Sequence, residues 1–85
     1  MTELVFARRF LRDLAEFEGT RSPRDVEALD RALAAIARDP NLPGRVPSFY
    51  DPTLPSYLYR AGQALVHYRG AGERVEFLNL FFARL

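Results

Sequence analysis

The last third of the chain most constrains the fold, because residues 56–84 form three short runs in which side chains alternate between two faces. Two glycine-containing turns separate these runs. Ala61-Gly62 predicts the first turn, and the four residues 70–73, Gly-Ala-Gly-Glu, predict the second. Glycine is favoured at hairpin turns because it adopts positive φ at little cost. The stretch therefore predicts three consecutive antiparallel strands.

A first helix is predicted from Arg8 to about Phe17. Its apolar residues recur at helical spacing along one face, and they are Phe10, Leu11, Leu14 and Phe17. The opposite face carries charged residues. We expect Arg9 to form an ion pair with Asp13 on this face, and we expect the face to be exposed to solvent. Gly19 predicts the end of the helix.

A second helix has a clear predicted start. Ser22 fits the N-cap position, and Pro23 fits the first helical position, where no backbone N–H is needed. Apolar residues then recur at helical spacing until Pro40, so the helix should end near Arg38. The short connection between the two helices favours an antiparallel helical hairpin.

Five of the six prolines lie in residues 39–55, which we interpret as an ordered, irregular loop pinned by Phe49 and Tyr50. Before the helices, Glu3–Phe6 predicts a short strand. Together these elements predict one α+β domain over residues 1–85. Its helical hairpin should pack on one face of a small antiparallel sheet.

The expected register places Arg60 opposite Gln63 and Tyr68 opposite Val75, which divides the strand residues between two faces. The first face is mainly apolar and should receive the helices: Tyr57, Tyr59, Ala64, Val66, Tyr68, Val75, Phe77, Asn79 and Phe81. The second face is mixed: Leu58, Arg60, Gln63, Leu65, His67, Arg69, Glu76, Leu78, Leu80, Phe82 and Arg84. Two helices cannot cover both faces. The second face should therefore be partly open or covered by another chain, and the apolar patch of Leu78, Leu80 and Phe82 predicts a partner there.

Composition excludes several kinds of site. The chain has no cysteine, which excludes disulfides and thiolate metal ligands and fits a reducing, cytoplasmic location. We expect no cofactor, no metal and no membrane span. All twelve basic residues are arginine, yet the net charge is only +1, which does not favour a general nucleic-acid binder.

Three features carry a family resemblance. Arg60-Ala-Gly62 opens the central hairpin, Tyr68 closes its second strand, and Arg84 lies near the end of the last strand. With the predicted order of elements, these features resemble the RelE/ParE toxin superfamily of type II toxin–antitoxin modules. In RelE-type mRNA interferases an arginine follows the hairpin glycine by three residues, whereas this chain has Leu65. The hairpin is more similar to the ParE branch, whose members are gyrase poisons.

The resemblance implies a toxin that inhibits growth by binding a large target, for a ParE-like protein DNA gyrase, and that a cognate antitoxin neutralises. A RelE-like, ribosome-dependent mRNA interferase is the alternative, and a non-toxic interaction module is a further one. Whether the protein is an enzyme stays open at this point. Possible partners are the antitoxin, gyrase or the ribosome with its mRNA, and a second copy of the chain.

The candidate site residues lie on the mixed face. RNA cleavage would need cations and a proton-transfer group, which makes Arg60, His67 and Arg84 the catalytic candidates. His67 is expected opposite Glu76, an arrangement that favours a structural hydrogen bond over catalysis. The residues expected to bind a partner are Arg60, Arg69, Leu78, Leu80, Phe82 and Arg84.

Overall fold

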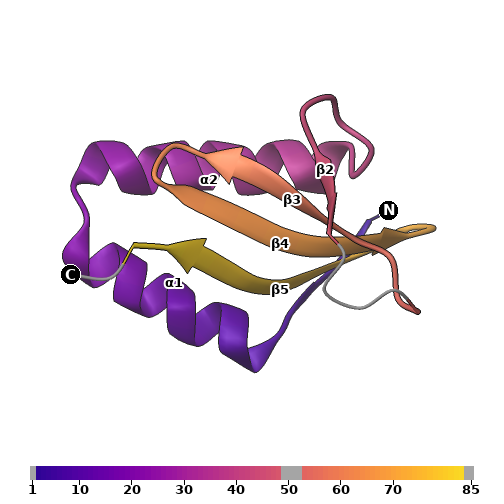
Figure 1. Ribbon diagram of the computed structural model, residues 1–85, viewed down its shortest axis with the longest axis horizontal. Helices are drawn as coiled ribbons and strands as arrows, with labels where there is room; N and C mark the ends of the chain where they lie inside the picture. The colour runs from indigo at the N-terminus through magenta and orange to yellow at the C-terminus, as the bar shows by residue number, and fades with distance from the viewer. Residues whose placement is uncertain (1, 49–52, 84–85) are drawn as a thin grey trace.

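The computed structural model describes residues 2–48 and 53–83 (Figure 1). In chain order the elements are β1 (Glu3–Phe6), α1 (Arg8–Thr20), α2 (Pro23–Arg38), β2 (Val46–Ser48), β3 (Ser56–Ala61), β4 (Ala64–Ala71) and β5 (Arg74–Phe82). This order confirms the predicted α+β class, with a short N-terminal strand, two helices and three C-terminal strands. None of the helices in the described residues is long and apolar enough to cross a membrane.

The second helix begins and ends where the sequence predicts. The Ser22 hydroxyl accepts a hydrogen bond from the Asp25 backbone N–H at 3.3 Å, and Pro23 is the first helical residue. The first helix is longer than predicted, because α1 continues through Gly19 to Thr20. A helical glycine costs about 1 kcal/mol but does not forbid the helix. The Thr20 hydroxyl also donates to the Glu16 carbonyl at 2.9 Å, which helps to hold the last turn.

The five strands form one sheet in the order β1-β5-β4-β3-β2. β1 runs parallel to β5, whereas the other neighbouring pairs are antiparallel, so the sheet is mixed at one edge. Both helices cover the same face of this sheet (Figure 1), with α1 against β5 and α2 across β3 and β4. The buried core lies between these layers. It comprises Phe10, Phe17, Leu29, Ala32, Ile36, Leu42, Ala61, Ala64, Val66, Tyr68, Val75, Phe77 and Leu80.

The proline-rich stretch contains one strand that we did not predict. β2 pairs antiparallel with β3 and places Pro47 opposite Tyr57. β2 is an edge strand, where a residue without an N–H is tolerated. The expected anchors Phe49 and Tyr50 lie outside the described residues. The described part of the stretch is held by buried Leu42 and by the Tyr68 hydroxyl, which donates to the Pro40 carbonyl at 2.6 Å.

Both hairpin turns differ from the prediction. Each has two residues, Gly62-Gln63 and then Gly72-Glu73, with the glycine in the first position at φ +61°. Arg60 therefore lies opposite Leu65 rather than Gln63, and Tyr68 lies opposite Phe77 rather than Val75. These shifts change cross-strand partners but keep each residue of β3 and β4 on its predicted face.

A β-bulge at Leu78 reverses the predicted faces in the second half of β5. Tyr68 pairs with Phe77, whereas the preceding residue His67 pairs with Asn79, so Leu78 is the extra residue. Each extra residue exchanges the faces of all residues beyond it. Leu80 is consequently in the helix-side core at 1% exposure, and Phe82 packs against that core. Their expected position on the mixed face is wrong.

Asn79 and Phe81 change faces in the opposite direction. We predicted both against the helices, but Asn79 pairs with His67 and Phe81 pairs with Leu65, whose side chains point away from the helices. Phe81 is 40% exposed. Of the three residues predicted for the apolar patch, Leu78 stays on the mixed face, whereas Leu80 and Phe82 leave it and Phe81 joins it.

Candidate functional site

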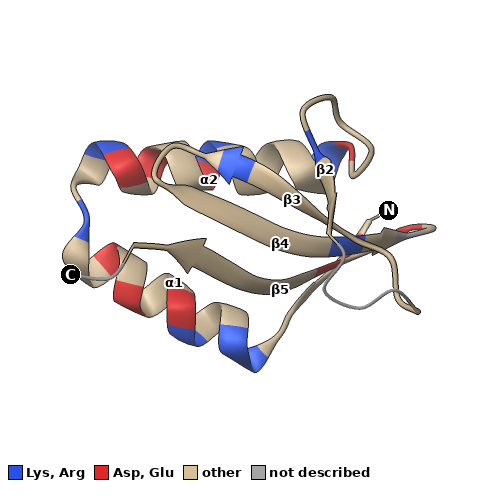
Figure 2. Cartoon of the chain, in the orientation of Figure 1, with Lys and Arg blue, Asp and Glu red and all other residues tan. Residues whose placement is uncertain are grey.

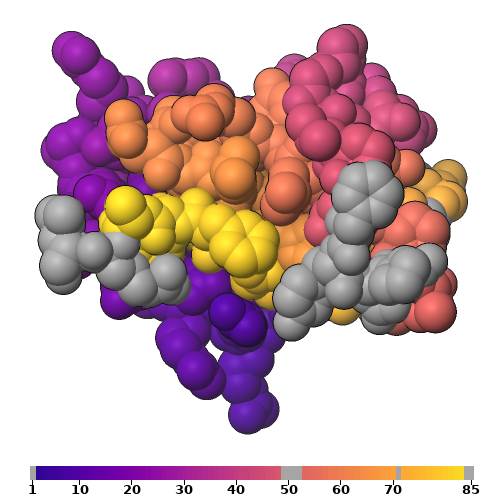
Figure 3. Space-filling view, in the orientation of Figure 1, coloured from indigo at the N-terminus to yellow at the C-terminus, as the bar shows by residue number. Residues whose placement is uncertain are grey.

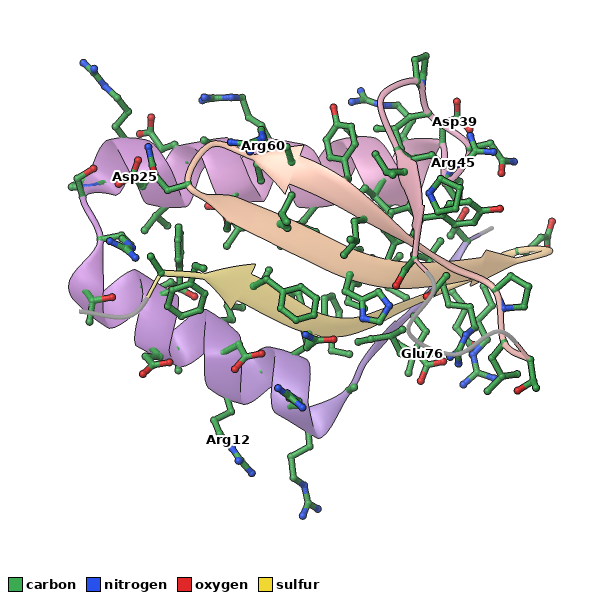
Figure 4. All side chains as sticks on the ribbon, in the orientation of Figure 1. Arg12, Asp25, Asp39, Arg45, Arg60 and Glu76 are labelled. Carbon is green, nitrogen blue, oxygen red and sulfur yellow. The ribbon has the colours of Figure 1, made fainter. Side chains whose placement is uncertain are left out.

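The face of the sheet turned away from the helices, here called the open face, is uncovered by other described elements. Figures 3 and 4 show this face toward the viewer, with side chains of β4 and β5 at its surface. The open face carries Ser56, Leu58, Arg60, Leu65, His67, Arg69, Glu76, Leu78, Asn79 and Phe81. Charged residues lie mostly on the helices and near the strand ends (Figure 2), which leaves the middle of the sheet largely uncharged.

A hollow of about 280 Å³ opens on this face near the bulge. Its lining residues come from α1 and three adjacent strands: Arg9, Ser56, His67, Arg69, Leu78, Asn79 and Phe81. Two arginines, two large apolar groups and three smaller polar groups thus meet in one place. His67, Arg69 and Leu78 are sequence-predicted site residues that the fold does bring together.

Three buried polar side chains form a hydrogen-bonded relay across the hollow. Ser56, His67 and Asn79 are 4%, 4% and 8% exposed. His67 Nδ1 lies 2.7 Å from Asn79 Oδ1, and His67 Nε2 lies 2.8 Å from Ser56 Oγ. An amide oxygen only accepts, so Nδ1 carries the proton in neutral His67. The other nitrogen then accepts from the Ser56 hydroxyl, which leaves His67 poised as a base toward that hydroxyl.

We predicted that His67 lies opposite Glu76, and this prediction is wrong because His67 lies opposite Asn79. Glu76 lies directly opposite Arg69 instead, and their side chains form an ion pair with Nη1 3.3 Å from Oε1. Both side chains are about 30% exposed, at 28% and 31%, so solvent weakens this pair. Arg69 Nε is shielded from solvent and has no hydrogen-bond partner among the described residues.

Arg60 shares the open face with His67 but lies in another part of it. Arg60 is exposed near the first turn, where Nη1 lies 3.5 Å from the Gly62 carbonyl. It lines a separate groove with Gly62, Gln63, Ala64, Leu65, Phe81 and Phe82. The structure therefore does not bring Arg60 and His67 into one hollow. Arg84 lies outside the described residues, and its role stays a prediction.

Sequence reasoning missed four members of the hollow. Arg9 was assigned to a solvated helix face, Ser56 was given no role, and both Asn79 and Phe81 were placed against the helices. Asn79 faces His67 because of the bulge at Leu78. The alternation of apolar and polar residues in the sequence does not predict this bulge. Outside the hollow, Asp13 was also assigned to the solvated helix face, but it is buried at 5% exposure.

Comparison with known proteins gives structural matches only. No family model matches the chain, and no curated protein matches it by sequence. A YoeB/ParE toxin from Agrobacterium tumefaciens superposes with a TM-score of 0.74 at 22% identity, covering 98% of this chain and 100% of that one. The chain therefore has the fold of the YoeB/ParE toxins over nearly its whole length.

Two structures from Staphylococcus aureus are also similar. A YoeB dimer matches with a TM-score of 0.71 at 16% identity, covering 98% of both chains. YoeB in a complex with YefM matches with a TM-score of 0.69 at 15% identity, covering 99% of both chains. These matches agree with the fold that the resemblance to the RelE/ParE superfamily predicted, and they do not distinguish its branches.

Proposed function

We propose that this chain, which has the fold of the YoeB/ParE toxins, is the toxin of a type II toxin–antitoxin pair. It arrests growth by binding a large cellular target, and a cognate antitoxin neutralises it. The observation that carries the proposal is the open face, which the helices leave uncovered in a fold shared with a toxin solved together with YefM. Half-buried Leu58 and Leu65 and exposed Phe81 give this face apolar area for a protein partner.

The proposed binding residues are Arg60, Arg69 and Leu78 on the open face, with Arg84 as a further prediction. Arg60 is exposed beside the first turn, so it is able to contact an acidic partner surface. Leu80 and Phe82 are excluded from this surface because they pack on the helix side. A second copy of the chain is another possible occupant of the open face.

Two features favour target binding over ribosome-dependent RNA cleavage. Leu65 occupies the position at which the interferases resembling this chain have an arginine. Arg60, the arginine that carries the family resemblance, lies in a different groove from His67, whose hollow is lined by Arg9 and Arg69 instead. The proposed action is therefore nearer the ParE branch, with DNA gyrase as the first target to test.

Growth arrest on induced expression in a bacterial host tests the toxin function. If a neighbouring reading frame encodes a small acidic protein with a DNA-binding N-terminus, its co-expression should restore growth. A supercoiling assay with gyrase then tests the target, and incubation with purified ribosomes and mRNA tests cleavage. Normal growth together with antitoxin binding would instead support the non-toxic interaction module. Ribosome-dependent cleavage would support the interferase.

Binding through the open face is tested by titrating the purified chain with the antitoxin. Leu78→Asp and Arg69→Glu should each weaken binding at least tenfold. The matched control is Leu11→Asp, because Leu11 is a large apolar residue that is 51% exposed on α1. Thermal melts establish that each variant is folded. Equal binding by all three variants would contradict the proposed surface, and light scattering of the free chain would detect a homodimer.

A further inference from the structure

We propose that Ser56, His67 and Asn79 form a nucleophilic relay that cleaves small esters carrying an anionic group. Ser56 is the nucleophile, His67 is the general base, and Asn79 is a positioning residue that orients His67. The proposal concerns the hollow on the open face and does not depend on toxicity. It assigns a chemical activity to the three relay residues, which are not among the proposed target-binding residues.

The geometry meets the requirements of an activated serine. A nucleophile needs a base within about 2.6–3.2 Å and a third group that orients the base. The 2.8 Å contact from Ser56 Oγ to His67 Nε2 meets the first requirement, and the 2.7 Å contact from His67 Nδ1 to Asn79 Oδ1 meets the second. The same order of roles, with asparagine as the third member, occurs in cysteine proteases. The relay is buried, yet all three residues line the hollow, through which a substrate can approach.

The bulge at Leu78 is the structural device that assembles the relay. Without the extra residue, position 79 would point toward the helices and His67 would lack its acceptor. Bulges interrupt the strand ladder and are frequent beside active sites, where they redirect side chains. Here the bulge places Leu78 and Asn79 together in the hollow.

The rest of the hollow defines the class of substrate. Arg69 lines the hollow and supplies a positive charge, which suits the oxyanion that forms when an ester carbonyl is attacked. Arg9 adds a second positive charge for an anionic substituent, while Leu78 and Phe81 supply apolar walls. A volume of about 280 Å³ limits the substrate to a small molecule.

The reaction balances with water as the second reactant. Ser56 Oγ bonds to the carbonyl carbon as its proton moves to His67 Nε2. The bond to the leaving oxygen breaks, and His67 returns the proton to that oxygen, releasing an alcohol and leaving an acyl-serine. Water then attacks the acyl carbon and gives a proton to His67. The Oγ–carbon bond breaks, Ser56 regains the proton, and a carboxylic acid is released.

Labelling of the purified full chain with a fluorophosphonate probe tests the nucleophile. Ser56 Oγ should bond to phosphorus with loss of fluoride, and mass spectrometry should locate the adduct on Ser56. Ser56→Ala should abolish labelling, and His67→Gln should slow it about 100-fold or more. The matched control is Ser48→Ala, because Ser48 lies opposite Ser56 in the neighbouring strand and should label like the unaltered chain.

The positioning role of Asn79 has its own test. Asn79→Asp keeps an oxygen acceptor for Nδ1 and should retain labelling, whereas Asn79→Leu should lose it in a chain that still melts cooperatively. The labelling rate of the unaltered chain should follow a single protonation as pH changes. This titration needs no variant, so it remains informative if His67→Gln does not fold.

Hydrolysis of nitrophenyl esters tests the substrate class. The chain should hydrolyse 4-nitrophenyl hemisuccinate, which is anionic, faster than 4-nitrophenyl acetate, and Arg9→Gln should remove this preference. Absence of both labelling and hydrolysis in the folded chain would overturn the proposal. It would also be overturned by an adduct on a tyrosine or Ser48, by labelling of folded His67→Gln at the unaltered rate, or by a labelling rate independent of pH.

Discussion

Asp13 in α1 accepts a hydrogen bond from the backbone N–H of Leu80 in β5, with Oδ2 3.1 Å from the nitrogen. β1 pairs with β5 only as far as Phe77, and the Ala7 N–H then donates to the Phe77 carbonyl at 2.9 Å. Beyond this point the outer edge of β5 has no neighbouring strand among the described residues. The Leu80 N–H is buried at this edge, and Asp13 provides the hydrogen-bond acceptor that no strand supplies there. The contact explains why a carboxylate lies within the buried face of α1.

Replacement of Asp13 should therefore destabilise the fold. Asp13→Ala should lower the free energy of unfolding by about 1.5–3 kcal/mol, since it removes a hydrogen bond to a charged group and leaves a buried donor. Asp13→Asn retains an acceptor and should cost less. Chemical denaturation measures both, with Glu18→Ala as the exposed control on the same helix. If Asp13→Ala were as stable as this control, the contact would have no energetic role.

The reversal of faces at the bulge predicts opposite behaviour of two neighbouring residues in β5. Leu80→Ala should lower the free energy of unfolding by about 2–5 kcal/mol, because Leu80 is 1% exposed in the core. Phe81→Ala should cost much less, because Phe81 is 40% exposed on the open face. Urea denaturation of the two variants distinguishes the observed faces from those expected for uninterrupted alternation. If Phe81→Ala lowered the free energy of unfolding more than Leu80→Ala, the bulge would have to lie elsewhere in the strand.

Two glycine-to-alanine changes should have opposite signs. Gly19→Ala should stabilise the chain by up to about 1 kcal/mol, because Gly19 is helical and a Cβ there would meet nothing within 4 Å. Gly70→Ala should destabilise it, because the new Cβ would lie 2.9 Å from Pro40 Cβ. Melting temperatures provide the comparison. A stabilised Gly70→Ala variant would show that the proline-rich stretch yields to the added methyl group without cost.

Alkaline unfolding should depend on Tyr68. Burial raises the pKa of its hydroxyl from 10.0 to about 12. The neutral form is favoured in the folded chain, so this stabilisation is complete below about pH 10 and is lost as pH rises toward about 12. Tyr68→Phe should lose roughly 1 kcal/mol at neutral pH, because the hydrogen bond to Pro40 is removed. It should then show a smaller stability loss between pH 10 and 12. Denaturation at several pH values measures both effects, and an unchanged pH dependence would exclude Tyr68 as the cause.

Toxicity should depend more on Arg60 than on His67. Arg60→Ala removes an exposed cation from the open face and should weaken growth arrest while changing the free energy of unfolding by less than about 0.5 kcal/mol. His67→Ala leaves the buried Ser56 and Asn79 groups without their shared partner, so its main effect should be a loss of stability. Arg24→Ala, at an exposed position on α2, is the control.

Growth assays and thermal melts measure these effects. A stable His67→Ala variant that loses toxicity, with an active Arg60→Ala variant, would support the alternative enzymatic toxin.

Some features of the fold depend on interactions between residues close in sequence, and these could be predicted. The start of α2 follows from the Ser22 cap and from Pro23, and both hairpins follow from glycines that adopt positive φ. Each feature lowers the local free energy before any tertiary contact forms. The same holds for the alternation that assigned His67 and Arg69 to one face.

The sequence alone left the second half of β5 undetermined, because Leu78, Leu80, Phe81 and Phe82 provide large apolar groups for either face. Only the tertiary structure decides the register, since one extra residue buries Leu80 under the helices and turns Asn79 toward His67. This register is stabilised by the packing of Leu80 in the helix-side core and by the buried hydrogen bond between His67 in β4 and Asn79 in β5. The candidate site therefore depends on contacts that exist only in the folded chain, whereas its elements are encoded locally.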